Sequence, residues 1–94
     1  MGFPEQRPLL FSRIIVEMLP EGRNGCYGLF KEGQWVYVGK GDIRQRLMDH
    51  LNGDNPCITR HAPTHVVLDE SANMDEREKV LIAELKPTCN QRVG

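Results

Sequence analysis

The chain has 94 residues, of which 39% are hydrophobic, and this size allows one domain with one small core. The net charge of −1 at pH 7 weighs against a protein dedicated to binding nucleic acid, because phosphate contacts usually require a basic domain. Cys26, Cys57 and Cys89 are widely spaced and odd in number, which argues against a disulfide framework. With no visible signal peptide or membrane span, we expect a soluble, cytoplasmic protein.

The charges are distributed unevenly along the chain. Residues 23–65 carry six basic and four acidic side chains, together with all three histidines, whereas residues 66–94 carry six acidic and four basic side chains. We therefore expect any polyanion to meet residues 23–65.

The N-terminal part has a helical pattern. Pro8 can begin a helix that ends near Leu19, before a proline and a glycine. In such a helix Leu10, Ile14 and Met18 share one apolar stripe.

Two β-rich runs follow, 26–30 and 34–38, with residues 31–33 as a three-residue hairpin loop. This register places Tyr27 directly across from Tyr37, on the same face of the sheet, whereas a two-residue loop would put the rings on opposite faces. A glycine beside each tyrosine would let a large group, such as a phosphate, approach. Paired tyrosines are also common as simple packing.

The next segment reads as a helix from Ile43 to about Leu51, with Asp42 as its N-cap. Arg46 and His50 are four residues apart and therefore project from the same side of this helix.

A third strand at 65–68 and a helix from Asn73, ending before Pro87, complete the expected fold. We expect the α+β class, with a three-stranded antiparallel sheet flanked by helices, a β-β-α-β-α core and an extra N-terminal helix. Residues 1–24 would be the helical extension and residues 25–94 the core of this single domain.

Glu78 is the most informative residue of the last helix, because it lies on the same stripe as Met74 and Leu81. An ionised carboxylate that faces a core needs a partner. Glu78 therefore coordinates a hard cation such as Mg²⁺, pairs with Arg46 or Lys40, or rotates to the rim of the core.

The Cys57-x3-His61-x3-His65 pattern suggests zinc, but the spacing matches no common zinc site and falls in an expected loop and strand. Lys40, which has a glycine on each side, is a better candidate for a phosphate contact.

Taken together, these motifs resemble the GIY-YIG nuclease family. The resemblance covers Gly25 to Asn90, about two thirds of the chain. The matching residues, in order, are Gly25-Cys26-Tyr27, Tyr37-Val38-Gly39, Lys40, Arg46, His50, the Glu76-Arg77-Glu78 run and Asn90.

The resemblance implies a divalent-metal-dependent endonuclease that hydrolyses DNA phosphodiester bonds. Glu78 would bind Mg²⁺ or Mn²⁺. Tyr27 or Tyr37 would orient or deprotonate the attacking water, and Tyr27 is favoured if Lys40 lowers the pKa of its phenol. Arg46 would neutralise charge that grows on the phosphoryl oxygens.

The remaining candidate residues have supporting roles. His50 would assist water activation or hold a phosphate, Asn90 would support the site through hydrogen bonds, and Lys40 and Arg44 would contact the substrate. Two features depart from the family pattern: Cys26 replaces the usual isoleucine, and the loop after Lys40 is one residue shorter.

Double-stranded or branched DNA is the expected substrate, and a protein partner could supply specificity, because similar enzymes carry a separate DNA-binding domain. The alternative is a non-catalytic adaptor that keeps the fold and binds nucleic acid or a protein. The acidic pI of about 6.3 favours the adaptor. The complete set of site residues favours the nuclease.

Overall fold

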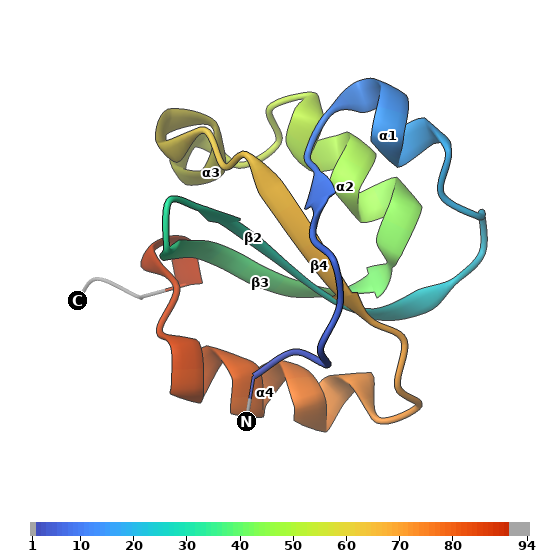
Figure 1. Ribbon diagram of the computed structural model, residues 1–94, viewed down its shortest axis with the longest axis vertical. Helices are drawn as coiled ribbons and strands as arrows, with labels where there is room; N and C mark the ends of the chain where they lie inside the picture. Colours follow the sequence, from blue (N-terminus) through green and yellow to red (C-terminus); the bar gives the residue numbers. More distant parts are fainter. Residues whose placement is uncertain (1, 91–94) are drawn as a thin grey trace.

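The computed structural model describes residues 2–90, which form a four-stranded antiparallel sheet with helices on both faces (Figure 1). The elements, in chain order, are β1 (Leu9–Leu10), α1 (Arg13–Glu17), β2 (Asn24–Lys31), β3 (Gln34–Asp42), α2 (Ile43–Leu51), α3 (Pro56–His61), β4 (His65–Asp69), α4 (Met74–Leu85) and the 3-10 helix η1 (Thr88–Asn90). The strands lie in the order β1-β4-β2-β3, so β1 and β3 form the two edges. The α+β class is confirmed.

The sheet has four strands rather than the expected three, because the N-terminal segment adds β1. Leu9 and Leu10 pair with Val66 and His65 of β4. The N–H of Phe11 continues this attachment by donating to the carbonyl of Thr64. Residues 9–11 therefore run as an extended segment along β4 before α1 begins.

The expected helix from Pro8 to about Leu19 is wrong, since α1 has only five residues. Ser12 caps its N-terminus and accepts from the backbone of Ile15, after the strand has ended. The side chains expected to form a buried stripe are exposed: Leu10 is 58% exposed, Ile14 72% and Met18 75%.

The hairpin loop between β2 and β3 has two residues, not three. Lys31 pairs with Gln34, and Glu32 and Gly33 both have positive φ angles, 45° and 78°. Positive φ at both central positions is typical of the type I′ turn, whose twist matches that of the flanking strands.

A bulge in β3 compensates for this shorter loop. The register shifts by one residue between Leu29 and Phe30, and beyond the shift Tyr37 lies opposite Leu29 while Gly39 lies opposite Tyr27. The expected direct pairing of Tyr27 with Tyr37 is therefore wrong. The extra residue nevertheless restores the side-chain alternation, so the two rings share one face and are diagonal neighbours.

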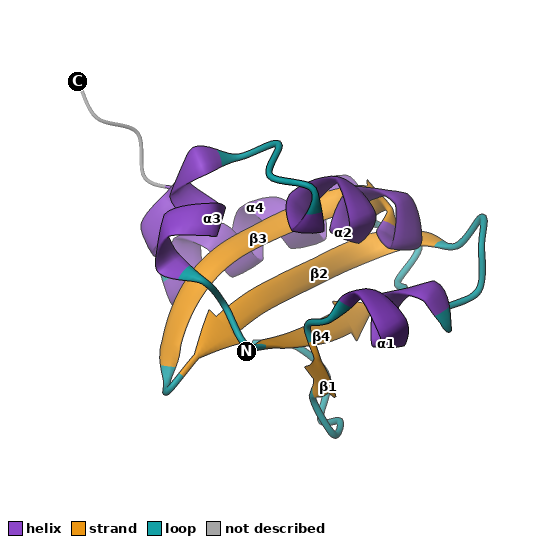
Figure 2. Cartoon of the chain, turned by 90° about the horizontal axis from the view of Figure 1, so that it is seen from above, coloured by secondary structure: helices purple, strands orange, loops and turns teal. Residues whose placement is uncertain are grey.

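The sheet separates two layers of packing, with α1, α2 and α3 on one face and α4 on the other (Figure 2). Alternation along β2 sends Tyr27 toward α2 and Cys26 toward α4. Leu47 of α2 and Leu81 of α4 are fully buried in these two layers.

The N-terminal caps of α2, α3 and α4 differ in how well the sequence predicted them. Asp42 accepts from the backbone N–H of Gln45 at 3.1 Å, which confirms the start of α2. Asn73 precedes α4 but makes no side-chain capping bond. The segment expected to be a loop contains α3, which Asn55 caps.

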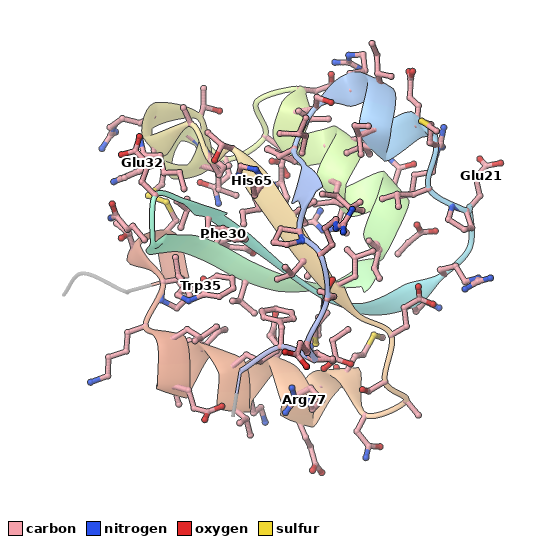
Figure 3. All side chains as sticks on the ribbon, viewed as in Figure 1. Glu21, Phe30, Glu32, Trp35, His65 and Arg77 are labelled. Atoms are coloured by element: carbon pink, nitrogen blue, oxygen red, sulfur yellow. A yellow bond between two sulfur atoms is a disulfide. The ribbon has the colours of Figure 1, made fainter. Side chains whose placement is uncertain are left out.

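The N-terminal segment also packs on the α4 side of the sheet. Trp35 lies between Phe3 and Phe30, with ring centroids 5.6 and 5.1 Å away, and Trp35 and Phe30 can be followed in Figure 3. Gln6 bonds both the N–H and the carbonyl of Leu68. These contacts fix residues 2–7 to the domain.

The expectation that the cysteines form no disulfide framework is wrong for one pair. Cys57 of α3 and Cys89 of η1, 32 residues apart, form a disulfide with a Cα–Cα distance of 5.7 Å. Cys26 is free and buried. The fold brings together two helices whose proximity the spacing of the cysteines does not reveal.

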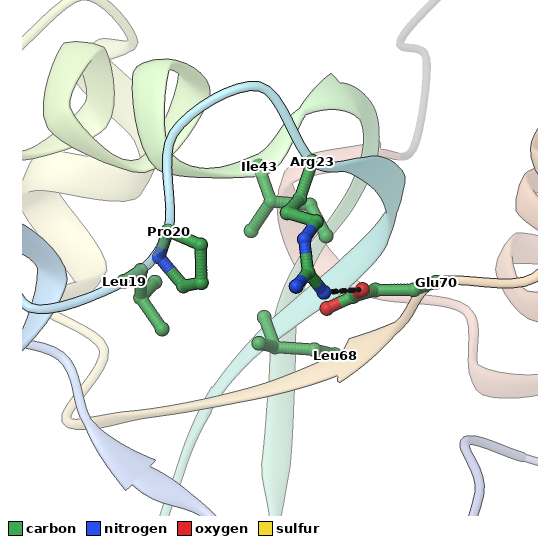
Figure 4. A pocket seen from close by; sticks show the side chains of 6 residues that line it. All are labelled: Leu19, Pro20, Arg23, Ile43, Leu68 and Glu70. Carbon is green, nitrogen blue, oxygen red and sulfur yellow. Dashed lines mark hydrogen bonds and ion pairs between the residues drawn. The ribbon is translucent and has the colours of Figure 1, made fainter.

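A small cavity lies where the loop after α1 meets the sheet (Figure 4). The Arg23–Glu70 ion pair, 2.9 Å long, borders it. Its volume of about 20 Å³ has room for roughly one water and not for a substrate. Within residues 2–90, the structure contains no helix long and apolar enough to cross a membrane.

Leu47→Ala tests the packing of α2 on the sheet. The deletion leaves a cavity beneath a fully buried side chain, so we expect the free energy of unfolding to fall by about 2–5 kcal/mol in urea titrations. Ile14→Ala removes a similar aliphatic group from an exposed position and should change it by less than about 0.5 kcal/mol. Equal losses would contradict the positions of both residues.

Candidate active site

Gly39 provides the space in which the two tyrosine rings meet. Their centroids are 6.3 Å apart. A Cβ atom at Gly39 would collide with the Tyr27 hydroxyl and would lie 2.8 Å from Cε2 of Tyr37. A Cβ at Gly25 would collide with the backbone of Asp69 at 2.5 Å. The space next to each glycine is therefore filled by other atoms of the protein, and a phosphate does not fit there as the sequence suggested.

A hydrogen-bonded chain joins β2, α2 and the loop after α2; its tyrosine and histidine are buried, whereas its aspartate side chain is 36% exposed. The Tyr27 hydroxyl lies 2.7 Å from Nε2 of His50, and Nδ1 of His50 lies 2.8 Å from Oδ1 of Asp54. Because a carboxylate can only accept, Nδ1–H donates to Asp54, Nε2 is the acceptor, and Tyr27 donates to it. Tyr27 is 0% exposed and His50 3%.

Burial controls the protonation of this chain. It raises the pKa of Tyr27 well above its usual range, while the charge of Arg46 acts in the opposite direction. It lowers the pKa of His50, which favours neutral imidazole, although Asp54 partly offsets this. Lys40 is not among the groups that act on Tyr27, and it pairs across the sheet with Cys26, whose side chain faces α4. The expectation that Lys40 lowers the phenol pKa is wrong.

Arg46 lies beside the two phenols and keeps acidic partners. Its Nη1 is 3.4 Å from Oδ2 of Asp49 and 3.9 Å from Oδ2 of Asp54. The side chain remains 39% exposed, so solvent and a ligand can reach the guanidinium. Arg46 also favours the ionised form of Tyr37.

Tyr37 lies on the edge strand β3, where charged side chains from both faces of the sheet can act on it. Burial raises the pKa of this half-buried phenol; Arg46 of α2 lowers it, and Glu78 of α4 raises it. The charges of two helices on opposite faces therefore act on one side chain. Tyr27, Tyr37, Arg46 and His50 lie together on the α2 side of the sheet, and Glu78 of α4 is linked to them only through the effect of its charge on Tyr37.

Of the three alternatives considered for Glu78, the structure shows the ion pair with Lys40. Lys40 lies 3.7 Å from Oε1 of Glu78 and 2.5 Å from Oδ1 of Asp75. The Glu78 side chain is 21% exposed, which places it at the rim of the α4 core.

Asn90 covers the outer edge of β3. Its side-chain oxygen accepts from the N–H of Val38 at 2.7 Å, and its amide donates to the carbonyl of Val38 at 2.9 Å. The side-chain amide thus makes, at Val38, the two hydrogen bonds that a neighbouring strand would make with the edge of the sheet.

Arg44 lies apart from this group. Its Nη1 is 3.4 Å from Glu21 in the loop after α1. Among the described residues, its Nε is the one buried side-chain nitrogen or oxygen without a hydrogen bond.

Asp54 is a member of the site that the sequence patterns did not single out. The available signal was its spacing: Asp54 follows His50 by four residues, and the turn after α2 brings its carboxylate back to the imidazole.

The donor set at Glu78 fits a hard divalent cation that keeps most of its water. Mg²⁺ commonly uses one or two carboxylates together with substrate phosphate oxygens. Glu78 supplies one partly exposed carboxylate, which lies 3.7 Å from Nζ of Lys40 and whose charge acts on Tyr37. Within residues 2–90, the group of three possible ligands that lies elsewhere is Cys57, His61 and Cys89.

Comparison with protein-family models, with curated proteins and with solved structures finds no significant match to this chain.

The lowered pKa of His50 predicts how stability depends on pH. The groups that face the ring are Tyr27, Tyr37, Asp54, Arg46 and Asp49. Because the folded pKa lies below the ordinary value of 6.5, the unfolded chain binds more protons between the two values. The free energy of unfolding should therefore fall as the pH drops below about 6.5, and this contribution should be constant above it.

Urea titrations at about pH 5.5 and pH 7.5 measure this effect. His50→Asn should lose less stability on acidification than the wild type does, because one proton-linked group is gone. Ile14→Ala, which changes an exposed side chain without a titratable group, serves as the control and should retain the wild-type loss. An undiminished loss in His50→Asn would contradict the assignment.

Proposed function

We propose that this protein is a DNA endonuclease of the GIY-YIG type, which hydrolyses phosphodiester bonds with Mg²⁺ or Mn²⁺. The observation that carries the proposal is the Tyr27–His50–Asp54 chain, in which Tyr27 and His50 are buried, next to Arg46 and Tyr37. A simple aromatic packing pair needs neither a neutral, oriented imidazole nor a cation beside its hydroxyl groups.

The two tyrosines differ in access, and this assigns them different roles. Tyr37 is half-buried and is the phenol that can orient the attacking water. Tyr27 is fully buried, so we assign it to positioning His50 and not, as the sequence favoured, to direct contact with water. If Tyr27 transfers its proton to Nε2, Arg46 stabilises the phenolate and Asp54 stabilises the imidazolium.

Arg46 is the group that would neutralise charge on the phosphoryl oxygens. Its guanidinium reaches solvent, and its distances of 3.4 and 3.9 Å to Asp49 and Asp54 are long for ion pairs. A phosphate can therefore compete for its donors. Lys40, partly exposed on the same edge strand, is the second candidate for a phosphate contact.

Glu78 would hold the divalent cation, after exchanging its contact with Lys40. When bound, the cation would polarise the scissile phosphate and stabilise the leaving 3′ oxygen. Asn90 contributes by fixing the backbone of β3 between Tyr37 and Gly39.

One observation favours the alternative, a non-catalytic adaptor that binds nucleic acid or a protein. Lys40, Arg44 and Arg46 all have acidic partners within 4 Å, so the positive potential available to DNA is reduced. In an adaptor these acidic side chains can remain in their ion pairs, because no carboxylate has to be released to bind a metal. In that case DNA specificity, and any DNA binding, would depend on a protein partner.

Cleavage assays separate the two functions. With Mg²⁺ or Mn²⁺, the wild type should nick supercoiled plasmid or branched DNA, and Glu78→Gln and Arg46→Ala should each reduce the rate at least about 100-fold. Glu76→Gln removes an exposed carboxylate from the same helix and should leave the rate unchanged. An inactive wild type on all substrates, or equal rates for Glu78→Gln and Glu76→Gln, would overturn the nuclease proposal.

A further inference from the structure

A second group of reactive side chains lies between α3 and η1, apart from the tyrosine site. Cys57 and His61 are four residues apart on α3 and face the same way, and Cys89 reaches them from η1. One ligand atom from each lies within 4.8 Å of the others. All three side chains are partly buried, so an ion can reach them from solvent.

The position of His61 is not explained by the disulfide. Its Nδ1 is 3.7 Å from Sγ of Cys57 and 3.8 Å from Sγ of Cys89, nearly equidistant from the two sulfurs. In a tetrahedral zinc site, with bonds of about 2.3 Å to sulfur and 2.0 Å to nitrogen, a sulfur and a nitrogen ligand lie roughly 3.6 Å apart. The imidazole therefore occupies the place of a third ligand.

We propose that reduced Cys57 and Cys89, together with Nδ1 of His61, form a Zn²⁺ site whose fourth position is open to water. A dithiol reductant supplies two electrons and two protons, which cleave the disulfide into two thiols while the reductant becomes a disulfide. Binding of Zn²⁺ then releases both thiol protons, because the thiolates are the ligands.

The imidazole must change its hydrogen bonding when the ion binds. In the disulfide form Nδ1 lies 2.9 Å from the carbonyl of Cys57 and donates to it. Binding requires a free lone pair at Nδ1, so the proton moves to Nε2 and the carbonyl bond is given up. Thiolate and imidazole ligands suit Zn²⁺, and they disfavour the Mg²⁺ or Mn²⁺ of the tyrosine site.

The site would keep α3 attached to η1 when the disulfide is absent. Asn90, in the same 3-10 helix as Cys89, bonds both backbone groups of Val38 at the edge of β3. Either the disulfide or the ion therefore holds the segment that covers this edge. The proposal concerns binding and stability and does not depend on nuclease activity.

Cobalt titration of the reduced, metal-free chain tests the site directly, with Co²⁺ as a spectroscopic probe. One Co²⁺ per chain should bind with sulfur-to-cobalt charge-transfer bands and the intense visible bands of tetrahedral geometry, and one equivalent of Zn²⁺ should abolish them. Cys57→Ser and Cys89→Ser should remove the charge-transfer bands, and His61→Asn should weaken binding at least about tenfold. Cys26→Ala, which removes the free cysteine, should leave the spectrum unchanged.

Alkylation of the wild type provides a test that does not require a variant to fold. With Zn²⁺ bound, the thiols of Cys57 and Cys89 should react at least about tenfold more slowly than in the metal-free reduced protein, as peptide mass spectrometry can measure. An octahedral cobalt spectrum, equal alkylation rates, or a disulfide that survives excess dithiol in the folded protein would overturn the proposal.

Discussion

The candidate site depends on one extra residue in β3. The type I′ loop at Glu32 and Gly33 alone would place Tyr27 and Tyr37 on opposite faces of the sheet. The bulge returns both rings to the face covered by α2, and Gly39 leaves the space they fill. His50, Asp54 and Arg46 are then arranged around these two phenols.

Burial then determines what the phenols can do. Tyr27 is enclosed, and its hydroxyl is held by a neutral imidazole that Asp54 orients, whereas Tyr37 remains half-buried at the open edge of the sheet. Since β3 is an edge strand, Arg46 from one layer and Glu78 from the other both act on Tyr37. The architecture thus combines an enclosed Tyr27–His50 pair with a partly exposed phenol on the edge strand.

The sequence predicted those elements whose signals are local. Asp42 caps α2 as expected, and a β-rich run at 65–68 became β4, because capping and alternation act within a few residues. The apolar stripe of Leu10, Ile14 and Met18 was misleading, since pairing of Leu9 and Leu10 with β4 overrides helical periodicity. The bulge, the Asp54 contact and the Cys57–Cys89 pair depend on tertiary proximity and could not be derived from spacing alone.

A double-mutant cycle on cleavage tests most directly whether these residues act as one catalytic unit. Tyr37→Phe, Glu78→Gln and the double variant are compared with the wild type in single-turnover cleavage with Mn²⁺. Residues that act together have strongly non-additive effects, so the double variant should cleave about as fast as the slower single variant. Effects that multiply, or a wild type that does not cleave, would contradict a shared site at the edge of β3.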